Sequence, residues 1–161
     1  MTIETTINGM VHTLSIRSGD RLVDILRKDL KITSLLPDCR GGTCGRCLII
    51  MDGRLCHSCL LPAFKAQGAD ISTYERVSES PVALAVEKGF IEDGQHPCQF
   101  CRTAKIMVLT DLLIKSPLPD REEILDHLEL VPCPCTDPEA LSSTVQKVAE
   151  HINRRKFNRE K

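Results

Sequence analysis

The sequence predicts an α+β fold in two parts, a β-rich domain over residues 1–76 and a helical domain over residues 77–161. Short β-rich segments joined by turn residues fill the first part, whereas apolar residues at helical spacing fill the second. The cysteines also divide into two sets, five at 39–59 and four at 98–135. A chain of 161 residues is long enough for two small domains, each with its own cysteines.

Composition narrows the class of protein. A formal net charge of -1 argues against nucleic-acid binding, which depends on a marked basic excess. No apolar run approaches the ~20 residues of a membrane helix. The opening residues 1–4 lack the basic start and apolar core of a signal peptide, so we expect a cytoplasmic protein. In that reducing compartment, nine cysteines indicate metal sites rather than disulfides, and bound metal would stabilise two domains with small cores.

Turn signals organise the strands of the first domain. Asn8-Gly9 separates two β-rich segments, and both residues tolerate the positive φ of a type I′ turn, which predicts a hairpin. A second turn at Asp52-Gly53 is expected to precede a return strand that carries Cys59.

A helix is expected to lie across this sheet. Asp20 can cap a helix that runs to Leu30. The apolar face of that helix consists of Leu22, Ile25, Leu26 and Leu30. A last strand over residues 70–74 would complete the domain.

The first cysteine set has the spacing C-x4-C-x2-C, followed after eleven residues by a lone cysteine. This is the ligand spacing of a plant-type [2Fe-2S] centre. The cysteines concerned are Cys39, Cys44, Cys47 and Cys59. Gly41, Gly42 and Gly45 lie among them and permit positive φ and a close approach of backbone N–H groups to the sulfides. Structural zinc usually takes its ligands as two short-spaced pairs, and disulfides lack support from a secretory segment. By analogy with plant-type ferredoxins, hairpin, helix and cysteine loop predict a β-grasp domain.

The second domain is expected to be a four-helix bundle, joined to the first by a linker near residues 77–80. Residues 103–115 are apolar on nearly every side, which predicts a helix buried at the centre. The other helices begin at an N-cap before proline, at a capping box, and at a second proline. These signals are Ser80-Pro81, whose helix should end near Gly89, then Asp120 with Glu123, and Asp137-Pro138.

The second cysteine set falls between these helices. Cys98 and Cys101 lie between the first two helices, and Cys133 and Cys135 lie between the last two. In an antiparallel bundle both connections emerge at the same end, so we expect the four thiols to converge there. A C-x-C pair does not easily chelate one ion at relaxed geometry, which favours a second [2Fe-2S] centre, with zinc as the alternative.

With both sets in view, the chain resembles the small iron–sulfur subunit of the xanthine dehydrogenase and aldehyde oxidoreductase family of molybdenum hydroxylases. The resemblance rests on the first set with Ser58-Cys59-Leu60, and on Cys98-x2-Cys101 followed, after thirty-one residues, by Cys133-x-Cys135. It implies a β-grasp [2Fe-2S] domain and a helical [2Fe-2S] domain. It also implies a large molybdopterin-binding partner near the second centre and a FAD-binding partner facing the first.

Two departures from the family pattern concern the second centre. Family members usually read Gln-Cys-Gly-Phe-Cys, whereas this chain has Pro97 before Cys98 and Gln99 after it. The usual arginine of Cys-Arg-Cys is Pro134 here, which removes a cation from beside the cluster. These changes affect the expected interface with a molybdenum subunit rather than cluster ligation.

Several residues beside the cysteines admit a functional and a plainer interpretation. Arg40 and Arg46 would stabilise a reduced cluster, or they are solvated surface groups. Cys56 is an alternative fourth ligand, but a small buried hydrophobe is favoured. His57 and His96 make Rieske-type ligation imaginable, yet four cysteines already satisfy each site.

The expected function is electron transfer rather than catalysis. The sequence has no dinucleotide-binding glycine fingerprint, no P-loop and no nucleophile with its base, so no catalytic residue is assigned. We expect an electron-transfer subunit of a molybdenum hydroxylase that relays single electrons between a molybdopterin subunit and a flavin subunit or other acceptor. The alternatives are a free-standing two-cluster carrier and a module with structural zinc at the second site.

Overall fold

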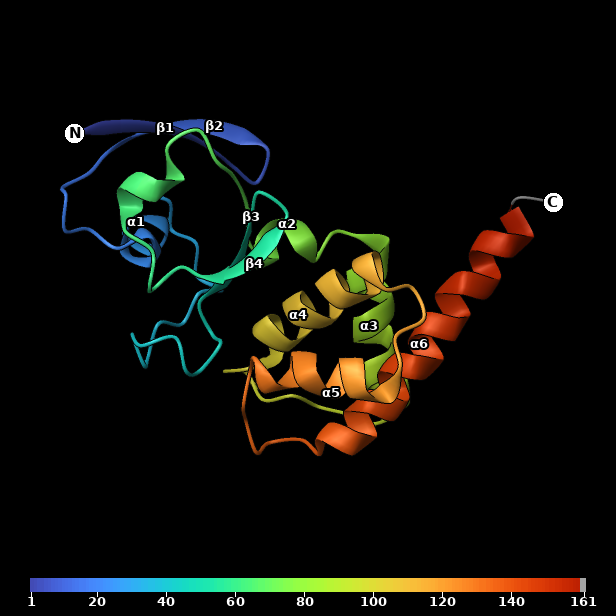
Figure 1. Ribbon diagram of the computed structural model, residues 1–161. Coiled ribbons are helices and arrows are strands. Elements are labelled where there is room, and N and C mark those ends of the chain that lie inside the picture. The colour runs from blue at the N-terminus through green and yellow to red at the C-terminus, as the bar shows by residue number, and fades with distance from the viewer. Residues whose placement is uncertain (160–161) are drawn as a thin grey trace. The chain divides into compact units, whose positions relative to one another are not determined.

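A computed structural model describes residues 1–159 and confirms the predicted α+β class (Figure 1). The chain forms two compact units, Met1–Val77 and Ser78–Lys161, and each is described by itself. None of the helices within residues 1–159 is long and apolar enough to cross a membrane.

The first unit is built on a five-stranded sheet in the order β2-β1-β5-β3-β4. Its strands are β1 (Thr2–Ile7), β2 (Met10–Ser15), β3 (Leu48–Met51), β4 (Arg54–His57) and β5 (Asp70–Ser72). β1 pairs antiparallel with β2 and parallel with β5, while β3 pairs antiparallel with both β4 and β5. Both predicted turns are confirmed, because Asn8-Gly9 and Asp52-Gly53 have positive φ at both residues and join antiparallel strands.

Helix α1 (Leu22–Lys28) is shorter than predicted, and Asp20 does not cap it. The N-cap residue is Arg21, whose side chain makes no capping hydrogen bond, and the Asp20 carboxylate accepts a hydrogen bond in the preceding turn instead. The first helical N–H groups are bound by carbonyls from a distant segment, Leu22 donating to Leu61 (2.8 Å) and Val23 to Ser58 (3.2 Å). A tertiary contact thus replaces the side-chain cap.

The prediction that Cys59 lies on the return strand is wrong. β4 ends at His57, and the N–H of Leu60 donates to the carbonyl of His57 at 3.0 Å, which closes a turn around Cys59. Beyond this turn lies the short 3-10 helix η1 (Ala63–Ala66), which the sequence did not indicate. β5 also ends at Ser72, before the expected Tyr74, because helix α2 (Tyr74–Val77) begins there.

The second unit holds four helices, which pack as neighbours in the cyclic order α3, α4, α5, α6 (Figure 1). They are α3 (Pro81–Glu92), α4 (Arg102–Lys115), α5 (Arg121–Glu129) and α6 (Pro138–Arg159). The predicted cap at Ser80 and the capping box at Asp120 are both confirmed. Helix α3 continues past Gly89, and a left-handed glycine, Gly94, follows its end.

Helix α4 occupies the centre of the unit, as predicted. Every residue from Ala104 to Leu113 is buried, so the helix has contacts on all sides over this stretch. Its buried residues include one lysine, Lys105, which is 3% exposed.

The absence of a side chain at Gly89 allows helices α3 and α6 to pack closely. A Cβ atom at this position would lie 2.4 Å from Cγ2 of Val148 and 3.5 Å from Cγ2 of Thr144. Valine in a helix is nearly restricted to one rotamer, so Val148 cannot turn aside.

We therefore expect Gly89→Ala to destabilise the second unit. The overpacking cost of about 1–3 kcal/mol should exceed the gain in helix propensity of about 1 kcal/mol. Urea unfolding followed by circular dichroism measures the effect. Gly19→Ala is the matched control, because a Cβ there meets nothing within 4 Å. Val148→Ala should relieve the defect when combined with Gly89→Ala, and an undiminished defect in the double variant would contradict this explanation.

Candidate metal centres

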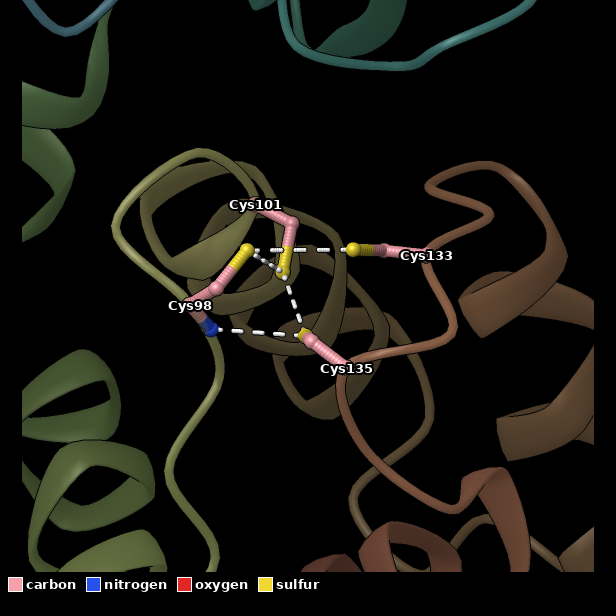
Figure 2. A group of neighbouring side chains, drawn as sticks. All are labelled: Cys98, Cys101, Cys133 and Cys135. Atoms are coloured by element: carbon pink, nitrogen blue, oxygen red, sulfur yellow. Dashed lines mark hydrogen bonds between the residues drawn. The ribbon is translucent and has the colours of Figure 1, made fainter.

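The four cysteines of the second set converge at one place, as the sequence predicted (Figure 2). The sulfur atoms of Cys98, Cys101, Cys133 and Cys135 all lie within 4.8 Å of one another. The Sγ–Sγ distances are 3.6 Å from Cys98 to Cys101, 3.8 Å from Cys98 to Cys133, and 3.3 Å from Cys101 to Cys135.

Two connections between helices bring these sulfurs together. Cys98 and Cys101 lie on the turn that starts α4, where the N–H groups of Cys101 and Arg102 both donate to the carbonyl of Cys98. Cys133 and Cys135 lie between α5 and α6. The N–H of Cys98 donates to the sulfur of Cys135 at 3.3 Å, which links the two connections directly.

The surroundings shift the pKa values of Cys101 and Cys135 in opposite directions. Burial raises the pKa of Cys101, and its neighbouring thiols raise it further. Burial acts to raise the pKa of Cys135 as well, but hydrogen bonds from the Cys98 backbone and the adjacent thiols lower it to about 6. Four thiolates cannot coexist this closely without positive charge, which a bound metal centre supplies.

The donor set suits a metal centre made of soft ligands. Four cysteine thiolates are the usual ligands of a [2Fe-2S] cluster. Tetrahedral zinc at about 2.3 Å from each sulfur would place the sulfurs about 3.8 Å apart, so the sulfur spacing also fits a single zinc ion.

The cysteines of the first set are arranged as two pairs. Cys39 is exposed beside Cys44, whereas Cys47 lies beside Cys59 and both of these are 0% exposed. Within residues 1–159, the four sulfurs of the first set do not converge into one group as those of the second set do. Two pairs suit a centre of two irons, each with two thiolates.

Hydrogen bonding and burial shift the pKa values of Cys39 and Cys47 in opposite directions. The backbone N–H of Gly41, 3.5 Å from the Cys39 sulfur, lowers the pKa of Cys39 to about 5, together with contacts from Thr43 and Cys44. Burial raises the pKa of Cys47 to about 12. The exposed Cys39 therefore ionises more readily than the buried Cys47.

The loop that carries the first set turns tightly through left-handed residues. Arg40, Gly42 and Gly45 have φ values of 49°, 77° and 70°. Gly41 was expected to share this conformation, but it lacks a positive φ and Arg40 takes that place. Gly42 also touches the segment beyond β4, since a Cβ there would lie 2.6 Å from Cδ1 of Leu60.

Two residues other than the cysteines fix the backbone of this site by hydrogen bonds. The hydroxyl of Ser58 donates to the carbonyl of Cys47 at 2.6 Å and is fully buried. Nη1 of Arg21 donates to the carbonyls of Arg40 (2.7 Å) and Cys59 (3.1 Å). Sequence reasoning missed Arg21, because its partners are 19 and 38 residues away and no local pattern joins them.

Comparison with known proteins decides the family. The model of the [2Fe-2S] binding domain family matches residues 73–146. The nicotine 6-hydroxylase small subunit of Paenarthrobacter nicotinovorans is 32% identical over 89% of this chain and 86% of its own length. The xanthine dehydrogenase iron–sulfur-binding subunit of Escherichia coli O157:H7 is 32% identical over 90% and 92%, respectively. The chain belongs to the small iron–sulfur subunits of the molybdenum hydroxylases.

Solved structures agree with this assignment to the small iron–sulfur subunits. A chain of quinoline 2-oxidoreductase from Pseudomonas putida 86 superimposes with a TM-score of 0.84 and 30% identity, over 96% of both chains. Aldehyde oxidoreductase from Desulfovibrio gigas gives a TM-score of 0.83 and 29% identity, over 96% of this chain and 17% of that chain.

Residues beside the cysteines of this small iron–sulfur subunit have defined partners. Arg40 pairs with Asp24 at 3.1 Å and Arg46 with Asp38 at 2.5 Å. The Asp24 carboxylate, by its hydrogen bond and charge, raises the pKa of Arg40. The ring of His57 buries its Nε2 atom without a hydrogen-bond partner in residues 1–159.

Cys56 packs against the core of the first unit as a half-buried side chain, and burial raises its pKa. This environment favours its interpretation as a small hydrophobe. His96 is exposed, Pro97 is buried, and Pro134 is exposed on the connection between α5 and α6.

Gly42 provides a test of the first centre. We expect Gly42→Ala to lower the iron content of the small subunit, because alanine at φ 77° costs about 1–2 kcal/mol and its Cβ would displace the side chain of Leu60. Iron analysis and visible absorption measure the loss. Gly41→Ala is the control in the same loop, since a Cβ there has only the Cys39 carbonyl at 3.7 Å. Equal iron content in both variants would contradict the proposed role of the loop.

Proposed function

We propose that this chain is the electron-transfer subunit of a molybdenum hydroxylase complex. It relays single electrons between a molybdopterin subunit and a flavin subunit or another acceptor. The observation that carries the proposal is the presence of two separate sets of four cysteines, one converged within 4.8 Å, in a chain of this family.

Each set has a role in the proposal. The first [2Fe-2S] centre is held by Cys39, Cys44, Cys47 and Cys59, and the second by Cys98, Cys101, Cys133 and Cys135. Iron–sulfur clusters exchange one electron at a time, at potentials set by hydrogen bonds, charge and exposure. The chain's own residues fix the ligands: Ser58 and Arg21 at the first set, and the Cys98 backbone at the second.

The relatives support a partner that carries the chemistry. Several are named as subunits of nicotine, nicotinate or xanthine enzymes, and the matching part of an aldehyde oxidoreductase is 17% of one longer chain. We infer a large molybdopterin-binding partner that oxidises a nitrogen heterocycle or an aldehyde, together with a FAD-binding partner. All nine cysteines are free, which suits a reducing, cytoplasmic location.

Two alternatives each have one observation in their favour. The sulfur spacing of the second set fits zinc, so a module with a structural zinc ion is the first. The second is a free-standing two-cluster carrier. It is favoured by Pro97, which has no side-chain amide where the family resemblance places glutamine.

Metal analysis separates the cluster proposal from zinc. The purified chain should hold about four irons and four labile sulfides, whereas zinc in the second set would leave about two of each. Cys133→Ser should remove one of two electron paramagnetic resonance signals of the reduced protein. Cys56→Ser is the control and should retain both signals. Two unchanged signals in Cys133→Ser would refute the ligand assignment.

Native purification separates a subunit from a carrier. We expect the chain, isolated from its source, to elute with a large molybdenum-containing partner, because an internal relay works only within reach of its enzyme. Native mass spectrometry with molybdenum analysis identifies the assembly. Recovery of the fully iron-loaded chain alone, with the molybdenum in separate fractions, would favour the carrier.

A further inference from the structure

A buried cation lies beside the second cysteine set. Lys105 is on α4 and is 3% exposed, although lysine is rarely buried unless it is paired. Its Nζ donates to Oγ1 of Thr136 at 2.7 Å. Thr136 is a neutral partner, so this hydrogen bond orients the ammonium group without neutralising it.

The charge of Lys105 has no carboxylate partner among the ion pairs formed within residues 1–159. The other lysine of the same helix behaves differently. Lys115 is half-exposed and pairs with Asp111 at 2.8 Å. Because burying an uncompensated charge is costly, Lys105 would be stabilised by an anion other than the carboxylates that form these ion pairs.

Lys105 lies near ligand residues of both cysteine motifs. Lys105 follows Cys101 by four residues, which places the two side chains on the same face of the helix start. Its hydrogen-bond partner Thr136 directly follows Cys135. Lys105 and Cys133 also line one cavity of ≈ 340 Å³. Glu129 lines the same cavity but forms no ion pair with Lys105 among the described residues, so we assign the counter-charge to the anionic centre proposed for these cysteines.

Backbone N–H groups also contribute to the surroundings of these sulfurs. Pro134 lies between two of the cysteines and has no N–H to donate to a sulfur. The backbone N–H of Cys98 reaches the Cys135 sulfur. Backbone hydrogen bonds from Phe100 and Cys101 also act on the Cys98 thiol, and one from Cys135 acts on the Cys133 thiol. A fixed ammonium is a stronger source of stabilisation for added negative charge than a neutral donor, particularly where water is excluded.

We propose that Lys105 is a positioning residue of the second [2Fe-2S] centre, where its buried charge favours the reduced state and raises the reduction potential. The inference rests on the proposed second cluster. Addition of one electron would make the cluster more negative by one charge, while the hydrogen bond to Thr136 holds the Lys105 ammonium in place. Removing the charge should therefore lower the potential of this centre alone.

The test is a redox titration of the iron-loaded full chain, with the two centres followed by their separate paramagnetic signals. In Lys105→Met, the ratio of oxidised to reduced second centre at the wild-type midpoint should rise about tenfold, equivalent to about 59 mV for one electron. The first centre serves as the internal reference and should not move. Lys105→Arg, which keeps the charge, should stay near the wild type.

Arg102→Met is the matched control. Arg102 is nearer to Cys101 in sequence, but it is exposed and pairs with Glu87 at 3.2 Å, so solvent screens its charge. If Lys105→Met loses iron from the second centre, the titration is repeated with Lys105→Gln. Glutamine keeps a hydrogen-bond donor for Thr136 but carries no charge.

Three outcomes would overturn the inference. They are an unchanged second potential in the uncharged variants, an equal shift of both centres, and a shift in Arg102→Met as large as that in Lys105→Met. The iron content of the wild type distinguishes this failure from failure of the proposed function. About four irons with an unmoved potential reject the role of Lys105 alone, whereas about two irons reject the second cluster on which it rests.

Discussion

The proposed second site depends on four thiol sulfurs that the helices of the second unit hold within 4.8 Å of one another. Thiolates at this distance repel, and the repulsion grows as water is excluded. The four helices oppose it by fixing both connections at their ends, with α4 buried along its whole central stretch. A rigid bundle is therefore a requirement of the site, because flexible connections would separate the sulfurs.

The first unit meets a related requirement by different means. Its three loop cysteines are presented by a chain that turns through the left-handed residues Arg40, Gly42 and Gly45. The fourth cysteine, Cys59, comes from beyond β4 and is tied back by the side chain of Arg21. The cysteine loop is anchored on the sheet, and long-range hydrogen bonds from Arg21 and Ser58 fix the position of the loop relative to Cys59 and the sheet.

Local signals made much of this fold predictable. Asn8-Gly9, Ser80 and the Asp120 capping box each act within a few residues, so their outcome does not depend on the rest of the chain. The failures arose where distant groups intervene. Carbonyls of Ser58 and Leu61 bind the first N–H groups of α1, so no capping residue was needed at Asp20. The spacing of the cysteines predicted the convergence of the second set, but it did not predict the contacts of Arg21 and Lys105, which involve partners distant in the sequence.

The two proposed centres differ most in where their positive charge lies. Arg40 and Arg46 stand at the surface and are paired with aspartates, so solvent, salt and those carboxylates weaken their field at the first set. Lys105 is buried and forms no ion pair with a carboxylate of the described chain, so solvent screens its charge less than it screens the exposed Arg40. Since potential follows local charge and exposure, such surroundings set the two centres independently. Because both sets offer the same four thiolates, a difference in potential between the two proposed centres must come from the environment of their cysteines.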